Sequence, residues 1–170
     1  MIEDVKNVVL QNSNIVIAPH YNGNHSSIVY TYQGHLYLKE TVDEVMNQIC
    51  IYFCSDLQGR INGTRKKYDF RKKPPILISE FLPQVAIPYP SHIAGEDMWV
   101  FNANFKIEEV EKSKSKIIFD NQLSFDIARN RDTIEKQRLR AIRILYDITY
   151  GDRLVGHGKG NVDRTFVASR

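Results

Sequence analysis

A cluster of basic residues gives this sequence its clearest chemical signal. Residues 58–75 contain seven cations and one acid, Asp69, so this window carries +6 while the whole chain of 170 residues carries +3. The cations are Arg60, Arg65, Lys66, Lys67, Arg71, Lys72 and Lys73. Like charges at this density repel one another unless an anion compensates them, so the cluster favours a polyanionic partner. Double-stranded DNA, with its dense row of phosphates, is such a partner.

The same window predicts a loop that approaches a ligand closely. Gly59 and Gly63 permit close backbone approach, and Asn62 between them tolerates the left-handed backbone region. Two prolines at 74–75 then stiffen the junction to the following strand. We therefore expect a basic loop with a fixed anchor.

The residues of this predicted loop fall into two expected roles. Arg60, Asn62 and Arg65 lie beside the glycines, and their side chain types can enter and read the narrow minor groove of A/T-rich DNA. The other cations are expected to contact phosphates: Lys66, Lys67, Arg71, Lys72 and Lys73.

Composition places the chain among ordinary globular proteins. Hydrophobic residues make up 42% and charged residues 25%, and no apolar run approaches the length of a membrane helix. We expect one domain over residues 1–150, located in the cytoplasm and associated with the nucleoid. Cys50 and Cys54 lack the spacing of a zinc or redox motif and are expected to be free thiols.

Periodicity predicts an α+β fold that consists mostly of antiparallel sheet. Two amphipathic helices are expected, at 42–54 with a capping box of Thr41 and Glu44, and at 132–149 with Asp132 as its N-cap. Expected strands are 14–19, 28–32, 35–39, 76–79, short proline-punctuated strands within 81–90, a strand over 98–107 with one aromatic face, and a hairpin around Asp120–Asn121.

The second predicted helix has two distinct sides. Its apolar side is expected to pack on the sheet, while Lys136, Arg140 and Arg143 form a basic side that offers additional DNA contacts. Beyond it, residues 151–170 are glycine-rich and are expected to form a flexible tail. The GHGKG of this tail lacks the spacing of a phosphate-binding loop.

Nothing in the sequence favours catalysis, a cofactor or a metal. The histidines are scattered, and no nucleophile, base or carboxylate pair matches a known catalytic motif. Two other functions compete with duplex binding. A binder of RNA or single strands would stack bases on Tyr68 and Phe70, and a protein-interaction module would dock an acidic partner on the basic face.

From Cys50 to Tyr146 the chain resembles the ComK family, the competence transcription factors of Gram-positive bacteria. The resemblance is carried, in order, by CIYFC, the basic stretch, KPPILIS, FLPQVAIPYP, DMWVFNANF, SKIIFDNQLSFDI and a helix that contains IEKQ. It implies an activator of DNA-uptake genes. It also implies dimers and tetramers that bind paired A/T-rich boxes, largely through the minor groove, and bend the DNA.

The chain departs from the family pattern at three places. Cys54 stands where the family tends to have Gly, and Gln122 stands where the family hairpin has the Gly of Asn-Gly. After Tyr150 there is no counterpart of the segment by which the adaptor MecA delivers ComK to proteolysis. Partners implied by the resemblance are thus duplex DNA and further copies of the chain. The family also has a MecA-like proteolytic adaptor as a partner, and the divergent tail argues against that partner for this chain.

Overall fold

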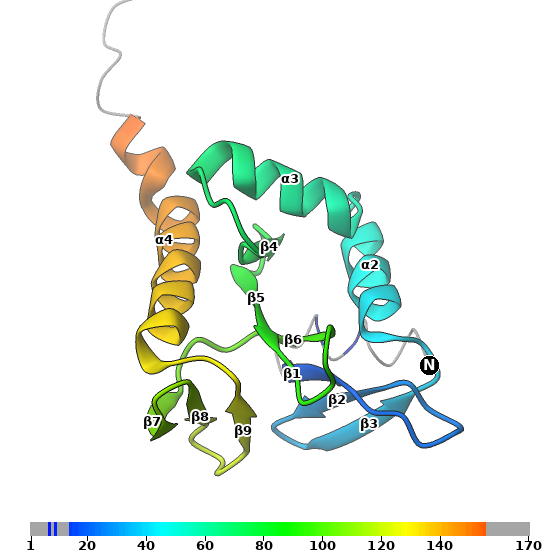
Figure 1. Cartoon of the computed structure of the whole chain (residues 1–170). Helices are drawn as coiled ribbons and strands as arrows, with labels where there is room; N and C mark the ends of the chain where they lie inside the picture. The colour runs from blue at the N-terminus through cyan, green and yellow to red at the C-terminus, as the bar shows by residue number, and fades with distance from the viewer. Residues whose placement is uncertain (1–6, 8, 10–13, 156–170) are drawn as a thin grey trace, which may run out of the picture.

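A six-stranded antiparallel sheet forms the centre of the structure, a computed structural model that describes residues 7, 9 and 14–155, with the backbone alone at 152–155 (Figure 1). Its strand order is β3-β2-β1-β6-β5-β4. The strands are β1 (Asn14–Pro19), β2 (Ser27–Thr31), β3 (Gly34–Leu38), β4 (Ile76–Ser79), β5 (Gln84–Pro90) and β6 (Asp97–Val100). The expected strands at 14–19 and 76–79 and the hairpin around Gln33–Gly34 are confirmed.

A smaller antiparallel sheet and three helices surround this sheet in the described part of the chain. The smaller sheet consists of β7 (Lys106–Glu111), β8 (Lys114–Ile118) and β9 (Ser124–Ile127). The helices are α2 (Val42–Tyr52), α3 (Leu57–Tyr68) and α4 (Arg131–Val155). Figure 1 shows α4 and the smaller sheet on one side of the molecule, with α2 on the other. The expected α+β class, with antiparallel sheets, is confirmed.

Strand alternation buries both faces of the large sheet. In β6, Met98 and Val100 belong to the core cluster that also contains Ile134 of α4, whereas Trp99 belongs to the cluster that contains Met46 of α2. Successive strand residues point to opposite faces, so apolar residues at consecutive positions indicate a sheet covered on both sides. Two cores therefore hold the helices on either side of one sheet.

The prediction of a continuous strand over 98–107 is wrong. β6 ends at Val100 and β7 begins at Lys106, because the chain leaves the large sheet here to enter the small one. The backbone N–H of Asn104 donates to the side-chain oxygen of Asn102 at 2.7 Å, a local bond that competes with strand pairing. The predicted aromatic face divides accordingly, with Trp99 in the core beside α2 and Phe105 in the core beside α4.

The predicted capping box at the start of α2 is confirmed. The Glu44 backbone N–H donates to the Thr41 hydroxyl at 3.3 Å, and the Glu44 carboxylate accepts from the Thr41 backbone N–H at 2.8 Å. These bonds to Thr41 lower the pKa of Glu44. They satisfy two amide groups that have no partner within the helix, which fixes where α2 begins.

The prediction of a loop after Cys54 is wrong, because residues 57–68 form the helix α3. Asp56 caps its N-terminus by accepting a hydrogen bond from the Gly59 backbone N–H. A Cβ atom at position 59 would lie 3.1 Å from this Asp56 oxygen, so the glycine makes room for the cap. At the other end, Asp69 adopts a left-handed conformation (φ 54°) and terminates the helix.

Arg60 fastens α3 to the rest of the fold. Its Nη1 atom donates to the Leu77 carbonyl of β4 at 2.5 Å, and its Nη2 atom donates to the carbonyl of Phe53, which caps the C-terminus of α2, at 3.0 Å. The guanidinium thus satisfies two carbonyls on different elements. Its side chain points toward the protein interior and not toward a ligand.

α4 begins and ends differently from the prediction. Its N-terminal cap is Asn130, whose side chain accepts from the Thr133 backbone N–H at 2.9 Å, and not Asp132, which lies within the first turn. The helix continues through Gly151 to Val155, so the start of the predicted tail is helical. The rest of that tail, 156–170 with its GHGKG, lies outside the described residues. No helix in the described part of the chain has the length and apolar character needed to span a membrane.

Two non-glycine residues occupy left-handed backbone positions at the points where the chain departs from the family pattern. Cys54, at the end of α2, has φ 59°, and Gln122, in the turn between β8 and β9, has φ 68°. A side chain with a Cβ atom is disfavoured in this region, whereas glycine is not. Both departures therefore fall on backbone positions that favour glycine.

We predict that Cys54→Gly and Gln122→Gly each raise the free energy of unfolding by about 0.5–1 kcal/mol, because relief of the left-handed penalty exceeds the added chain entropy of glycine. Urea unfolding measures the change. Cys54→Ala is the matched control and should give no gain, since it keeps the Cβ atom. A gain with Ala equal to that with Gly would contradict the backbone explanation.

We predict that Arg60→Ala lowers the free energy of unfolding by about 2–4 kcal/mol, because two carbonyls lose their charged donor. Arg65→Ala, on the same helix but exposed, should change it by no more than about 0.5 kcal/mol. Chemical unfolding of both variants provides the comparison. Similar stability in the two variants would show that Arg60 is not the anchor of α3.

Candidate nucleic-acid interface

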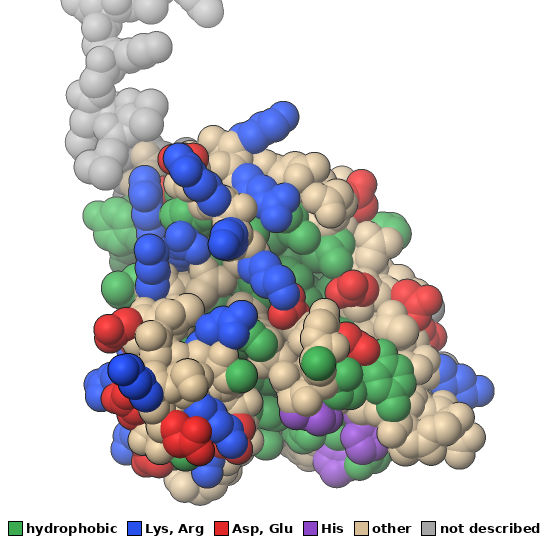
Figure 2. Space-filling model, in the orientation of Figure 1, with side chains coloured by type: hydrophobic (Ala, Val, Ile, Leu, Met, Phe, Trp, Pro, Cys, Tyr) green, Lys and Arg blue, Asp and Glu red, His purple; other side chains and the backbone are tan. Residues whose placement is uncertain are grey.

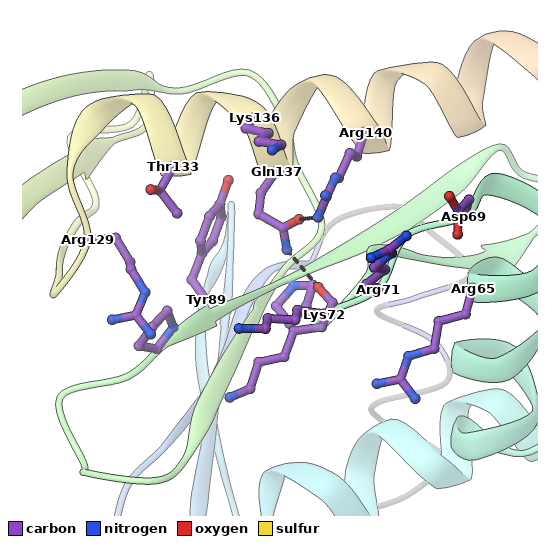
Figure 3. Close-up of a pocket in the computed structure, with 13 residues that line it drawn as sticks. Arg65, Asp69, Arg71, Lys72, Tyr89, Arg129, Thr133, Lys136, Gln137 and Arg140 are labelled. Carbon is purple, nitrogen blue, oxygen red and sulfur yellow. Dashed lines mark hydrogen bonds between the residues drawn. The ribbon is translucent and has the colours of Figure 1, made fainter.

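A basic cleft of about 880 Å³ opens between the end of α3, the segment 69–73, the strand β5 and the first half of α4. Figure 3 shows side chains from α4 on one side of this cleft and from α3 and the 69–73 segment on the other. One acid, Asp69, lines it together with seven cations. These are Arg65, Arg71, Lys72, Lys73, Arg129, Lys136 and Arg140. Such an excess of one charge suits a polyanion.

The cleft exists because α4 packs across β5. The buried Tyr89 hydroxyl donates to the Ile134 carbonyl at 3.0 Å, and burial raises the pKa of Tyr89, so the phenol stays protonated and remains a donor. One turn further along α4, the Gln137 side-chain amide donates to the Lys73 carbonyl at 2.7 Å. These two bonds set the position of α4 relative to the basic segment.

Aromatic rings orient two of the arginines beside the cleft. The Arg140 guanidinium lies over the Phe70 ring at 4.9 Å and donates to the Gln137 side-chain oxygen at 3.0 Å. The Arg143 guanidinium lies over the Tyr68 ring at 5.5 Å. Tyr68 and Phe70 stack on each other, with centroids 5.3 Å apart. The arginine heads are therefore held in place by contacts made before any ligand arrives.

Phe70 is not placed to stack on bases. Its side chain is buried in the core beside α4, with one neighbour in Tyr68 and another in Arg140. A base could reach the ring only if the side chain left this core. The geometry thus gives no support to the single-strand alternative, which requires both Tyr68 and Phe70.

The structure brings together six of the residues that the sequence proposed for DNA binding. The residues that line the cleft are Arg65, Arg71, Lys72, Lys73, Lys136 and Arg140. The two predicted groups, the basic stretch and the basic side of the last helix, thus form one surface. Among them, Lys73 also forms an ion pair with Asp97 at 2.7 Å, so part of its charge is already compensated.

The other predicted residues lie outside the cleft lining. Asn62, Lys66 and Lys67 are exposed on α3, where Asn62 accepts a hydrogen bond from Gln58 at 3.0 Å. Arg60 points inward, as described above. A helix distributes successive residues around its axis, so a run that would act together in a loop is separated here.

Arg129 was missed by the sequence analysis, although it lines the cleft. It is a single cation in the connection between β9 and α4, with no neighbouring basic residue other than Arg131. A helix directly downstream, with basic residues in its first turns, is the one signal that could have pointed to it.

Charge changes sign at the edge of the basic cleft. A second cleft of about 530 Å³ shares Arg65, Lys73 and Pro88 with the first, but its other lining residues include the acids Asp43 and Glu44. Figure 2 shows the same separation, with Lys and Arg side chains gathered on the upper left of this face and several Asp and Glu side chains to their right. Arg65 therefore stands at the border of the positive surface.

Comparison with known proteins identifies the family. A family model described as ComK protein matches residues 5–152, which is most of the chain. No curated protein and no solved structure matches the chain. ComK proteins are competence transcription factors that bind DNA. The match contains every residue of the basic cleft, and the chain belongs to the ComK family.

Proposed function

We propose that this protein is a competence transcription activator that binds A/T-rich double-stranded DNA through its basic cleft, largely in the minor groove, and acts as an oligomer. The observation that carries the proposal is the convergence of seven cations, from α3, the 69–73 segment, the β9–α4 connection and α4, on one cleft. Membership of the ComK family supports the transcriptional role and DNA as the partner.

Phosphate contacts supply most of the affinity in this proposal. Arg71, Lys72, Arg129 and Lys136 are exposed around the cleft and carry no ion pair among the described contacts. Each phosphate that a cation neutralises releases condensed counterions, so affinity falls steeply with salt. If roughly five cations in each subunit contact phosphates, the logarithm of the binding constant falls with the logarithm of salt with a slope of about −4 to −5.

Two arginines are placed to supply the A/T preference. Arg65 is exposed where the basic cleft borders the second cleft, and Arg140 is oriented by Phe70 and Gln137. The minor groove of an A/T tract is narrow and has a strongly negative potential, which attracts an inserted guanidinium. We assign groove contact to these two arginines, in place of Arg60.

The proposal is tested by fluorescence-anisotropy titration of the full chain against an A/T-rich duplex, a G/C-rich duplex and a single strand, each at several salt concentrations. We expect tight binding with a steep salt dependence and a preference for the A/T-rich duplex. Equal affinity for all three would indicate a general nucleic-acid binder. Absence of binding at low salt would contradict the proposal and favour an acidic protein partner.

We predict that Lys72→Ala with Lys136→Ala reduces the steepness of the salt slope by about two, because two phosphate contacts are lost from opposite walls of the cleft. The double variant Lys39→Ala with Lys112→Ala is the matched control. It removes the same charge from exposed positions outside the cleft and should leave the slope almost unchanged. Equal salt slopes in the two double variants would contradict the assignment of phosphate binding to the cleft.

A further inference from the structure

An exposed apolar stripe runs along the outer side of α4. Its four side chains are spaced three or four residues apart, so they lie on one face of the helix. Their exposed fractions are 56% for Leu139, 45% for Ile142, 55% for Tyr146 and 45% for Tyr150. On the opposite side of α4, the helix residues Ile134, Ala141 and Ile144 are buried in the core. This stripe is not needed for the packing of the fold, and large contiguous apolar surfaces commonly mark an interaction site.

The stripe is a third face of α4, beside its core face and its cleft face. Thr133, Lys136, Gln137 and Arg140 line the basic cleft. Arg143 lies next to the stripe on the cleft side, where its guanidinium covers the Tyr68 ring. The apolar stripe therefore continues directly into the proposed DNA-binding surface.

We propose that this stripe pairs with the same stripe on a second copy of the chain, with the two α4 helices antiparallel and the twofold axis near Ile142. An isologous contact requires a self-complementary surface, and this register places Leu139 of each copy against Tyr146 of the other. Antiparallel helices also align their dipoles favourably. The pairing deepens the proposed function, because its linkage to duplex binding rests on that function.

The available area limits how strong this pairing can be. An aromatic side chain offers ~150–250 Å² and about half of each stripe residue is exposed, so one copy contributes roughly 400 Å². Both copies together then bury about 800 Å², below the ~1,200–2,000 Å² of stable interfaces. The stripe by itself thus supports a weak dimer that needs a further contribution.

The charges beside the stripe indicate what that contribution is. In the antiparallel register the Arg143 residues of the two copies come close to the axis on the same side, where Lys136 and Arg140 also lie. The groove on this side is also lined by Asp132 and Glu135, but the three cations outnumber these two acids, so the excess positive charge of the two copies is repulsive in the free protein. Phosphates bound along this side neutralise them, so duplex binding strengthens the pairing, and the two basic clefts join in one surface.

Disulfide trapping tests the pairing in the full chain. Ile142→Cys is introduced in a Cys54→Ser background. Cys50 is buried and its pKa is raised to about 11 by burial, so it stays unreactive at neutral pH. Phe81→Cys in the same background is the control, because this side chain is 93% exposed and belongs to the turn between β4 and β5, not to the stripe. Both are oxidised in low salt, in low salt with an A/T-rich duplex, and in ~1 M salt, where charges are screened beyond ~3 Å.

We expect Ile142→Cys to form on the order of tenfold more covalent dimer than Phe81→Cys with the duplex and in high salt, and little in low salt alone. Adding Tyr146→Gln should lower that yield about tenfold, because it removes the partner of Leu139. Equal dimer yields from the two cysteine variants under all three conditions would falsify the pairing.

The three conditions separate failure of the pairing from failure of the proposed function. Dimer in high salt without duplex binding would reject the DNA-binding proposal but support the pairing. Duplex binding without dimer would reject the pairing alone. Abundant dimer of Ile142→Cys in low salt without duplex would support the interface and overturn its dependence on phosphate.

Discussion

The packing of α4 across β5 is the contact on which the candidate site depends. The Tyr89 hydroxyl and the Gln137 amide each bond to a carbonyl on the other side of this junction, at Ile134 and Lys73. Without it, the cations of the 69–73 segment and those of α4 would be separate groups of charge. Bringing like charges together raises their mutual repulsion, and buried apolar contacts around Tyr89 and Ile134 must offset it. The cleft is thus a site in which folding energy maintains an arrangement that favours an anion.

Two arginines of α3, Arg60 and Arg65, have different structural roles because they lie on different sides of the helix. Arg60 and Arg65 are separated by little more than one turn of α3, yet the first donates to two carbonyls inside the fold and the second is exposed at the border of two clefts. A charge count cannot distinguish an arginine that holds the helix from one that faces solvent. The position of each residue around the axis decides its role, and that position depends on where Asp56 begins the helix.

The parts of the fold that were predictable from sequence are those in which local pattern and packing agree. The capping box of Thr41 and Glu44 indicated where α2 begins, and the short apolar run NIVIAP, bounded by turn-forming residues, indicated a strand. α3 was missed because two glycines and a run of charges resemble a loop, although Leu57, Ile61, Thr64 and Tyr68 recur at helical spacing. The cleft could be predicted only in part, since its two basic groups were visible but their meeting depends on the contact between α4 and β5. For Arg129 the one signal was indirect, namely the basic residues in the first turns of the helix directly downstream.

The three faces of α4 connect the charge of the site to its proposed assembly. One face is buried against the sheet, a second lines the basic cleft, and a third exposes Leu139, Ile142, Tyr146 and Tyr150. In the proposed pair, the cations that attract phosphate are also the groups that oppose contact between two copies. A weak apolar contact beside repelling charges is poorly occupied in the free protein and becomes stable when an anion spans both copies. Assembly on the duplex then follows from the same excess of positive charge that provides binding, and it needs no separate change in the fold.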